Sequence, residues 1–184
     1  MGRLSERAKR PVVVAIEMMQ RLPAYRRAAA RLRPEVRITE ATDDDLRAVR
    51  AWFNPGQDER PERRAPGVTD FVAKHGNRLV GFIQLVRRSE DFGVHGGFWL
   101  YSLRVRLTYR GMGLGEMLMQ TGIERARQDG AREVSGIVLE RNLPSMAMCR
   151  KLGFVVRTVP ELDAQSAQGG QTLGGRRMLL TKLL

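Results

Sequence analysis

The chain has 184 residues, 42% of them apolar, which is enough for one sizeable core but not for two ordinary domains. Its single cysteine excludes an intramolecular disulfide framework, and its two histidines have no spacing typical of a metal site, so we expect no metal. No apolar run approaches the length of a membrane span, and no secretory signal is apparent, so the sequence predicts a cytoplasmic protein.

The formal net charge of +12 suggests a polyanionic partner, but its distribution argues against nucleic acid. Residues 1–34 hold nine Lys or Arg against two acidic residues, and no nucleic-acid-binding motif accompanies this excess. We therefore divide the chain into an Arg-rich helical extension, 1–34, and a domain, 35–184. The extension, with helices expected at 12–22 and 24–32, is either a docking or homodimerisation arm or a loosely packed terminus.

The domain begins with alternating apolar residues around Val36 and Ile38 that predict a strand, followed by a helix capped by Thr42. Residues 54–67 are rich in Pro, Gly and charges, which is typical of a loop. The elements expected next are, in order, a hairpin of strands at 69–74 and 78–86, a loop at 89–97, a strand at 98–107, a helix at 113–128, a strand at 133–139, a helix at 144–152, a strand at 154–159, a loop at 161–175 and a strand at 178–183. This order predicts an α/β (α+β) mixed fold, with one mixed sheet and helices on both faces.

The most informative segment joins the long strand to the next helix through Arg110-Gly111-Met112-Gly113-Leu114-Gly115. Backbone N–H groups and the positive end of the helix dipole converge there, and the glycines permit close approach of a ligand. A dinucleotide fingerprint would need a third glycine where Glu116 stands, and a P-loop would need Gly-Lys-Ser/Thr. The segment therefore predicts an anion pocket of another kind.

This segment resembles the GNAT superfamily motif Arg/Gln-x-x-Gly-x-Gly/Ala, which is matched by Arg110, Gly113 and Gly115. A second pattern of the family, Asn-x-x-Ala-x-x-x-Tyr-x-Lys-x-Gly-Phe, is similar to the segment from Asn142 to Phe154, which keeps the intervals between Asn, Lys and Gly-Phe. Two matches in the expected order make the resemblance far more specific than either one alone.

The resemblance implies a GNAT-like central sheet, mostly antiparallel, whose middle strands splay apart to admit acetyl-CoA as the cosubstrate. It implies that main-chain groups near Leu103 and Val105 hold the pantetheine and that loop N–H groups bind the pyrophosphate. Asn142 is also the expected cap of its helix. The implied cofactor-binding residues are Leu103, Arg104, Val105, Arg110, Gly111, Met112, Gly113, Leu114, Gly115 and Asn142.

The resemblance further implies an N-acetyltransferase that moves the acetyl group directly from acetyl-CoA to the primary amine of an unidentified acceptor. The family's tyrosine, the acid toward the departing thiolate, is replaced by Cys149, whose ordinary pKa of about 8.5 is close to that of the thiol it would protonate. Cys149 is either this acid or a small core residue, and Tyr101 or Tyr109 are alternative donors. Glu140, at the end of the following strand, is the nearest acidic candidate for the base.

Two other functions stay open at this stage. The missing tyrosine and base also fit a non-catalytic acyl-CoA-binding regulatory module, which would release no CoA in the presence of amines. The basic extension also fits a nucleic-acid-binding or ribosome-associated protein, whose binding would collapse with salt and with deletion of residues 1–34.

Overall fold

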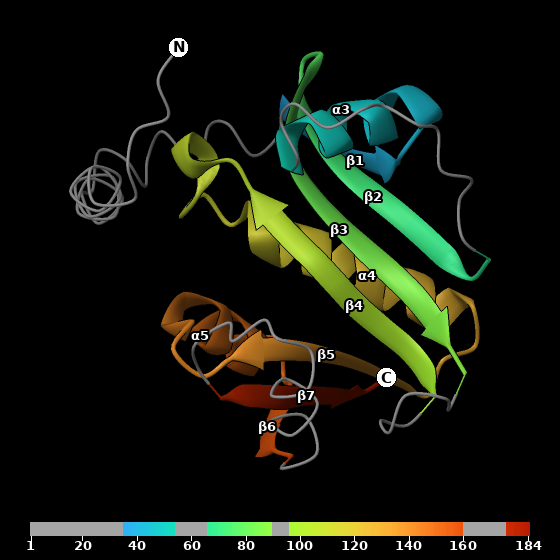
Figure 1. The fold of residues 1–184 in the computed structure, drawn as a ribbon, viewed down its shortest axis with the longest axis vertical. Coiled ribbons are helices and arrows are strands. Elements are labelled where there is room, and N and C mark those ends of the chain that lie inside the picture. Colours follow the sequence, from blue (N-terminus) through green and yellow to red (C-terminus); the bar gives the residue numbers. More distant parts are fainter. Residues whose placement is uncertain (1–34, 54–65, 90–95, 160–175) are drawn as a thin grey trace.

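The computed structural model describes residues 35–53, 66–89, 96–159 and 176–184 (Figure 1). In these residues seven strands form one sheet in the order β1-β2-β3-β4-β5-β7-β6. The elements, in chain order, are β1 (Val36–Glu40), α3 (Asp43–Phe53), β2 (Val68–His75), β3 (Arg78–Arg88), β4 (Gly97–Val105), the 3-10 helix η2 (Leu107–Tyr109), α4 (Leu114–Gln128), β5 (Glu133–Leu139), α5 (Leu143–Lys151), β6 (Val155–Thr158) and β7 (Arg177–Leu183).

Neighbouring strands of the sheet run antiparallel, except that β4 and β5 in the centre are parallel. This pair is parallel because α4 carries the chain back along the sheet between the two strands, as a crossover helix does. The mixed, mostly antiparallel sheet predicted from the sequence and the family resemblance is confirmed.

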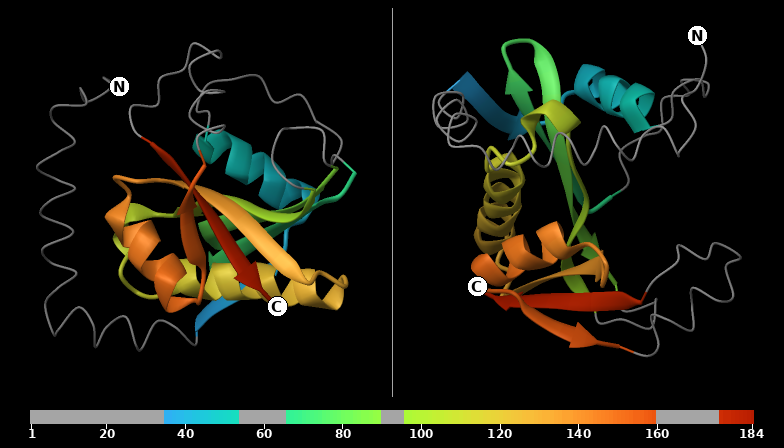
Figure 2. Two further views of the ribbon diagram at one scale, coloured as in Figure 1. Left: turned by 90° about the horizontal axis from the view of Figure 1, so that it is seen from below. Right: turned by 90° about the vertical axis from the view of Figure 1, so that its left-hand side faces the viewer.

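Helices cover both faces of the sheet, as the element order predicts. In Figure 2, α3 lies on one side of β2, β3 and β4, and α4 lies on the other. The α3 face packs Val49 of the helix against Val72 and Phe82 of the strands. The opposite face holds the largest buried cluster, which also takes in α5 through Met146 and Cys149.

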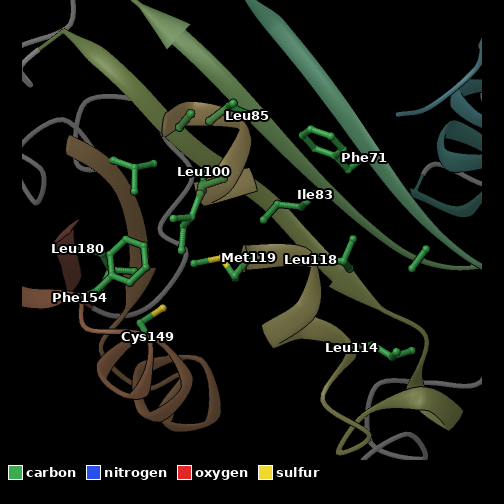
Figure 3. Close-up of a cluster of buried hydrophobic side chains, with 14 of the residues drawn as sticks. Phe71, Ile83, Leu85, Leu100, Leu114, Leu118, Met119, Cys149, Phe154 and Leu180 are labelled. Carbon is green, nitrogen blue, oxygen red and sulfur yellow. The ribbon is translucent and has the colours of Figure 1, made fainter. Parts of the chain in front are cut away.

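The core of the α4 face explains why this segment is a helix. Its buried side chains recur at helical spacing, so that one stripe faces the sheet while polar residues such as Gln120 and Glu124 face solvent. Figure 3 shows Leu114, Leu118 and Met119 of this stripe among side chains of the strands and of α5. Burying each large apolar side chain contributes about 1.5–3 kcal/mol to stability, so this stripe fixes the helix against the sheet.

The helix α3 begins at a capping box. The Thr42 hydroxyl accepts a hydrogen bond from the Asp45 N–H at 3.2 Å, and the Asp45 carboxylate accepts one from the Thr42 N–H at 3.0 Å. Lys74 of β2 lies 2.7 Å from the same carboxylate. Burial raises the pKa of Asp45, but the hydrogen bonds from Lys74 and Thr42 outweigh it and lower the pKa below its ordinary value.

Two predicted strand ends are wrong by two residues, and several predictions lie outside the described residues. The strand expected at 78–86 continues to Arg88. The strand expected at 98–107 ends at Val105, because the chain turns into η2 before the glycine loop. The helices expected at 12–22 and 24–32, the loop at 161–175 and nearly all of the loop at 54–67 fall outside the described ranges. Within those ranges, no helix is long and apolar enough to cross a membrane, and no cluster of metal-ligating side chains occurs.

Candidate functional site

The centre of the sheet opens between β4 and β5. Their register covers only Phe98, Trp99 and Leu100 of β4, although β4 runs on to Val105 and β5 to Leu139. Figure 1 shows the two strands close at one end and diverging toward the other. Beyond Leu100 neither strand has a sheet partner on this side, so their facing main-chain groups are available to a ligand that binds like an added strand.

A β-bulge in β4 lies next to this opening. Gln84 of β3 pairs with Tyr101 and Phe82 pairs with Arg104, so the register shifts across Ser102 and Leu103. Ser102 has φ of 56°, and it is the one non-glycine residue with positive φ in the described part of the chain. Bulges bend a strand and re-aim its groups. The kink therefore directs the main chain of β4 differently before and after the point where β5 departs.

The loop between β4 and α4 turns through two left-handed glycines. Gly111 has φ of 76°, and Gly113, the N-cap of α4, has φ of 79°, a region that strongly favours glycine. The Met117 N–H donates to the Gly113 carbonyl at 3.0 Å, so the N–H groups of residues 114–116 precede the helical ladder. Together with the helix dipole, these groups have the arrangement that the predicted anion site requires.

The same glycine loop packs closely against β4 and α5. A Cβ atom at Gly115 would lie 3.3 Å from Met148 Sδ and 3.9 Å from side-chain carbons of both Leu103 and Val105. The side chains of Leu103 and Val105 therefore pack against the core and leave their main chain for a cofactor. Arg110 Nε donates to the Val105 carbonyl at 3.2 Å and ties the loop to the end of β4.

A carboxylate lies in the first turn of α4, beside the anion site. Glu116 accepts hydrogen bonds of 2.7 and 2.9 Å from Lys151 Nζ at the end of α5. An exposed ion pair of this kind adds little stability, but it neutralises a negative charge where an anionic ligand would bind. The sequence identified Lys151 only as a motif position, and the structure adds its partner.

Cys149 lies in the hydrophobic cluster, with 3% of its surface exposed. In Figure 3 its sulfur lies on the α5 side of the cluster, near Phe154. Burial raises the pKa of the Cys149 thiol to about 11. This makes it a weaker acid than an ordinary thiol, which favours the interpretation of Cys149 as a core residue over that of a proton donor.

Tyr101 is the first residue of β4 beyond the pairing with β5. Its ring stacks on Trp99 at 5.9 Å between centroids, and its hydroxyl accepts a hydrogen bond of 2.5 Å from Arg88. Burial raises the pKa of Tyr101 more than the charge and hydrogen bond of Arg88 lower it. Tyr101 therefore keeps its proton at neutral pH and lies at the opening.

Tyr109, the other alternative donor, is held in a network that supports the loop. Its hydroxyl lies 2.9 Å from His75 Nδ1, and His75 Nε2 lies 3.0 Å from a Glu35 carboxylate oxygen. This arrangement joins the ends of β1 and β2 to the 3-10 helix that precedes the glycine loop. Tyr109 thus has a structural role that Tyr101 lacks.

The remaining predicted site residues, Glu140 and Asn142, lie after the C-terminal end of β5 and at the start of α5. Glu140 is exposed just after β5, and its N–H donates to the Arg176 carbonyl at 2.9 Å. Asn142 caps α5 as expected, since its side-chain oxygen accepts a hydrogen bond of 3.3 Å from the Ser145 N–H. The structure does not bring either residue into contact with Tyr101 or Cys149.

The sequence reasoning missed a basic pocket of about 400 Å³ between the end of β4 and α3. Four arginines contribute to its lining together with Trp52 of α3; they are Arg78, Arg104, Arg106 and Arg110. The alternation Arg104-x-Arg106 was the available signal, because residues two apart in an extended segment point to the same side.

Comparison with known proteins identifies related acetyltransferases. The model of the Acetyltransferase (GNAT) family matches residues 23–154. L-methionine sulfoximine/L-methionine sulfone acetyltransferase of Pseudomonas aeruginosa is 38% identical over 140 residues, which are 74% of this chain and 72% of that protein. Mycothiol acetyltransferase of Corynebacterium glutamicum is 35% identical over 81 residues, which are 44% of this chain and only 26% of that relative.

Solved structures share the fold. Ribosomal-protein-alanine N-acetyltransferase from Brucella melitensis has a TM-score of 0.60 at 23% identity, covering 80% of this chain and 99% of that one. NAA60 from Arabidopsis thaliana in complex with acetyl-CoA has a TM-score of 0.56 at 14% identity, covering 81% and 98%. The comparisons confirm the resemblance drawn from the two motifs, and with it the acyltransferase class and acetyl-CoA as the cosubstrate of the family. The chain belongs to the GNAT family of acetyltransferases.

Proposed function

We propose that this protein transfers the acetyl group of acetyl-CoA directly to a primary amine, with the cofactor bound between β4 and β5. The observation that carries the proposal is that the opening between β4 and β5 and the glycine loop lie next to each other. The opening between the strands begins after Leu100, and the glycine loop with its unpaired first-turn N–H groups lies where β4 ends. A pantetheine chain with a diphosphate at one end requires both features in this order.

The roles of individual residues follow from this arrangement. Main-chain groups of Leu103, Arg104 and Val105 bind the pantetheine, and one strand N–H beside the bulge stabilises the oxyanion as the amine attacks. The N–H groups of residues 111–115 bind the diphosphate, since the Arg110 N–H donates to the Leu107 carbonyl. Asn142 contributes to the cofactor site through the start of α5.

We assign the proton for the departing thiolate to Tyr101 rather than to Cys149. Tyr101 keeps its proton, has its hydroxyl oriented by Arg88 and lies beside the opening. Cys149 is enclosed by apolar side chains and has a raised pKa of about 11. Glu140 is retained as the base candidate, since it is exposed at the end of the strand that borders the opening.

For the acceptor, we propose the α-amino group of an amino-acid analogue. The support is the 38% identity with an enzyme named for L-methionine sulfoximine and L-methionine sulfone, which extends over 74% of this chain. The shorter match to mycothiol acetyltransferase makes a larger thiol-containing amine the natural comparison in the same assay.

Calorimetry and CoA release test the proposal. We expect acetyl-CoA binding, and CoA release that depends on L-methionine sulfone or a related amine. Gly113→Ala should weaken acetyl-CoA about tenfold, because a left-handed position costs a non-glycine residue about 1–2 kcal/mol. Gly76→Ala is the matched control, since Gly76 also has positive φ, a Cβ there meets nothing within 4 Å, and it lies in the β2–β3 turn.

Each outcome of this comparison has a distinct meaning. No heat with acetyl-CoA refutes the cofactor site itself. Binding without acceptor-dependent CoA release over a broad amine panel supports the non-catalytic acyl-CoA-binding module. Equal losses in Gly113→Ala and Gly76→Ala would show that the effect is one of folding and not of the anion site.

A further inference from the structure

The basic pocket lies where the end of β4 and the connection to α4 meet α3. Its lining includes Arg104 and Val105 of β4, Arg110 of the connection and Trp52 of α3. Arg104 reaches the α3 face, where its guanidinium lies 4.0 Å from the centroid of the Phe53 ring. The pocket therefore adjoins the first turn of α4, since Arg110 lines the pocket and also begins the glycine loop.

Three of the arginines in this pocket have no counter-charge among the described residues. Within the described part of the chain, the lining holds four arginines and no acidic residue. Arg78, Arg104 and Arg106 form no ion pair with any residue whose position is described. By contrast, Arg125 on the outer side of α4 contacts both Glu40 and Asp129. Unpaired positive charges gathered in a hollow attract an anionic ligand.

Two of these guanidinium groups are held in position. Arg106 Nε donates to the Leu79 carbonyl at 2.6 Å, and its guanidinium lies 4.8 Å from the centroid of the Trp52 ring. Arg104 is stacked on Phe53. Stacking fixes the plane of each guanidinium and reduces the rotamer freedom that is lost on binding. Fixed arginine forks match the oxygens of a phosphate group better than flexible surface charges do.

We propose that this pocket binds a phosphate monoester group, held mainly by Arg104 and Arg106 with Arg78 at its rim. The phosphate has two sources that this chemistry does not distinguish, namely the 3′-phosphate of the CoA cofactor and a phosphate carried by the acceptor. The assignment adds to the proposed acetyl transfer: its CoA source rests on the proposed cofactor site, whereas its acceptor source does not.

The test compares the affinities of arginine variants for two ligands that differ only in the 3′-phosphate. Arg104→Gln, Arg106→Gln and Arg78→Gln are compared with the wild-type protein by calorimetry, using CoA and 3′-dephospho-CoA. Arg127→Gln is the control, since it removes the same charge from an exposed arginine that pairs with Glu124 on the outer face of α4. Arg78 is exposed at the first residue of β3, so its substitution keeps the test valid if either stacked arginine proves necessary for folding.

If the 3′-phosphate of CoA occupies the pocket, the arginine variants weaken CoA about tenfold or more and leave 3′-dephospho-CoA almost unchanged. If the acceptor supplies the phosphate, both cofactors bind the variants normally. Inorganic phosphate then binds to CoA-saturated wild-type protein. This phosphate binding is lost in Arg104→Gln or Arg78→Gln but is retained in Arg127→Gln.

The proposal is overturned if the variants affect CoA and 3′-dephospho-CoA equally and CoA-saturated protein binds no phosphate. That result leaves the proposed acetyl transfer untouched, since acetyl-CoA binding and acceptor-dependent CoA release would persist in the wild-type protein. Loss of cofactor binding and turnover in the wild type would instead refute the acetyl transfer.

Discussion

The crossing of α4 over β4 offers a sharp test of the packing. A Cβ atom added to Gly122 would lie 2.5 Å from Leu100 Cδ2, and Leu100 is only 6% exposed. Gly122→Ala gains about 1 kcal/mol of helix propensity. Forcing Leu100 aside in a filled core costs about 1–3 kcal/mol. In the wild-type background the net effect therefore lies between zero and a loss of about 2 kcal/mol.

Leu100→Ala should reverse the sign of this substitution. The Leu100→Ala change alone costs about 2–5 kcal/mol, because it leaves a cavity. In that background the atom that clashes with the new methyl group is gone, so Gly122→Ala should stabilise the protein by about 1–2 kcal/mol through propensity and burial of the methyl. The two changes are then coupled by about 1–4 kcal/mol.

Urea unfolding of the four proteins measures this coupling from the midpoints, provided that the m-values agree. Gln120 is exposed on the same helix, so the difference between Gln120→Ala and Gln120→Gly calibrates the helix propensity at a site without the clash. Equal stabilisation by Gly122→Ala in both backgrounds would refute the close approach of α4 to β4.

Three further predictions concern side chains near the site and the cap of α3. The lowered pKa of Asp45 means that its contribution to stability is complete above about pH 4 and is lost as the pH falls through the lowered pKa. Asp45→Ala should therefore cost about 1–2 kcal/mol at pH 7 and progressively less as the pH falls, measured by urea unfolding, whereas a difference that does not vary with pH would contradict the ionic role. Tyr101→Phe should lower kcat about 100-fold while leaving acetyl-CoA affinity unchanged, because it removes the hydroxyl and keeps the ring on Trp99. A larger loss of kcat in Cys149→Ala would assign the role of general acid to Cys149 instead. Because Cys149 is buried and its pKa is raised to about 11, an aromatic disulfide reagent at pH 8 should modify it only in urea, and rapid modification of the native protein would show that the thiol is open to ligands.

The sequence by itself determined the local features whose physics involves near neighbours. The glycines of the loop and the cap at Thr42 each act within a few residues, so they predicted α4, α3 and the anion site before any tertiary contact was known. The two spaced motifs predicted the family, because their order along the chain carries information that composition lacks.

Only the tertiary structure decided how distant segments meet. The strands β4 and β5 pair over three residues and then diverge. This geometry depends on the bulge at Ser102 and on α4, which connects the two strands along the chain, and no local sequence pattern contains it. The environment of Cys149 was equally undetermined, since a cysteine on a helix is a donor or a core residue according to what α5 packs against. The arginine pocket joins α3, the start of β3, the end of β4 and the β4–α4 connection, so its charges gather only when the chain folds. The repulsion among these arginines is overcome by packing elsewhere.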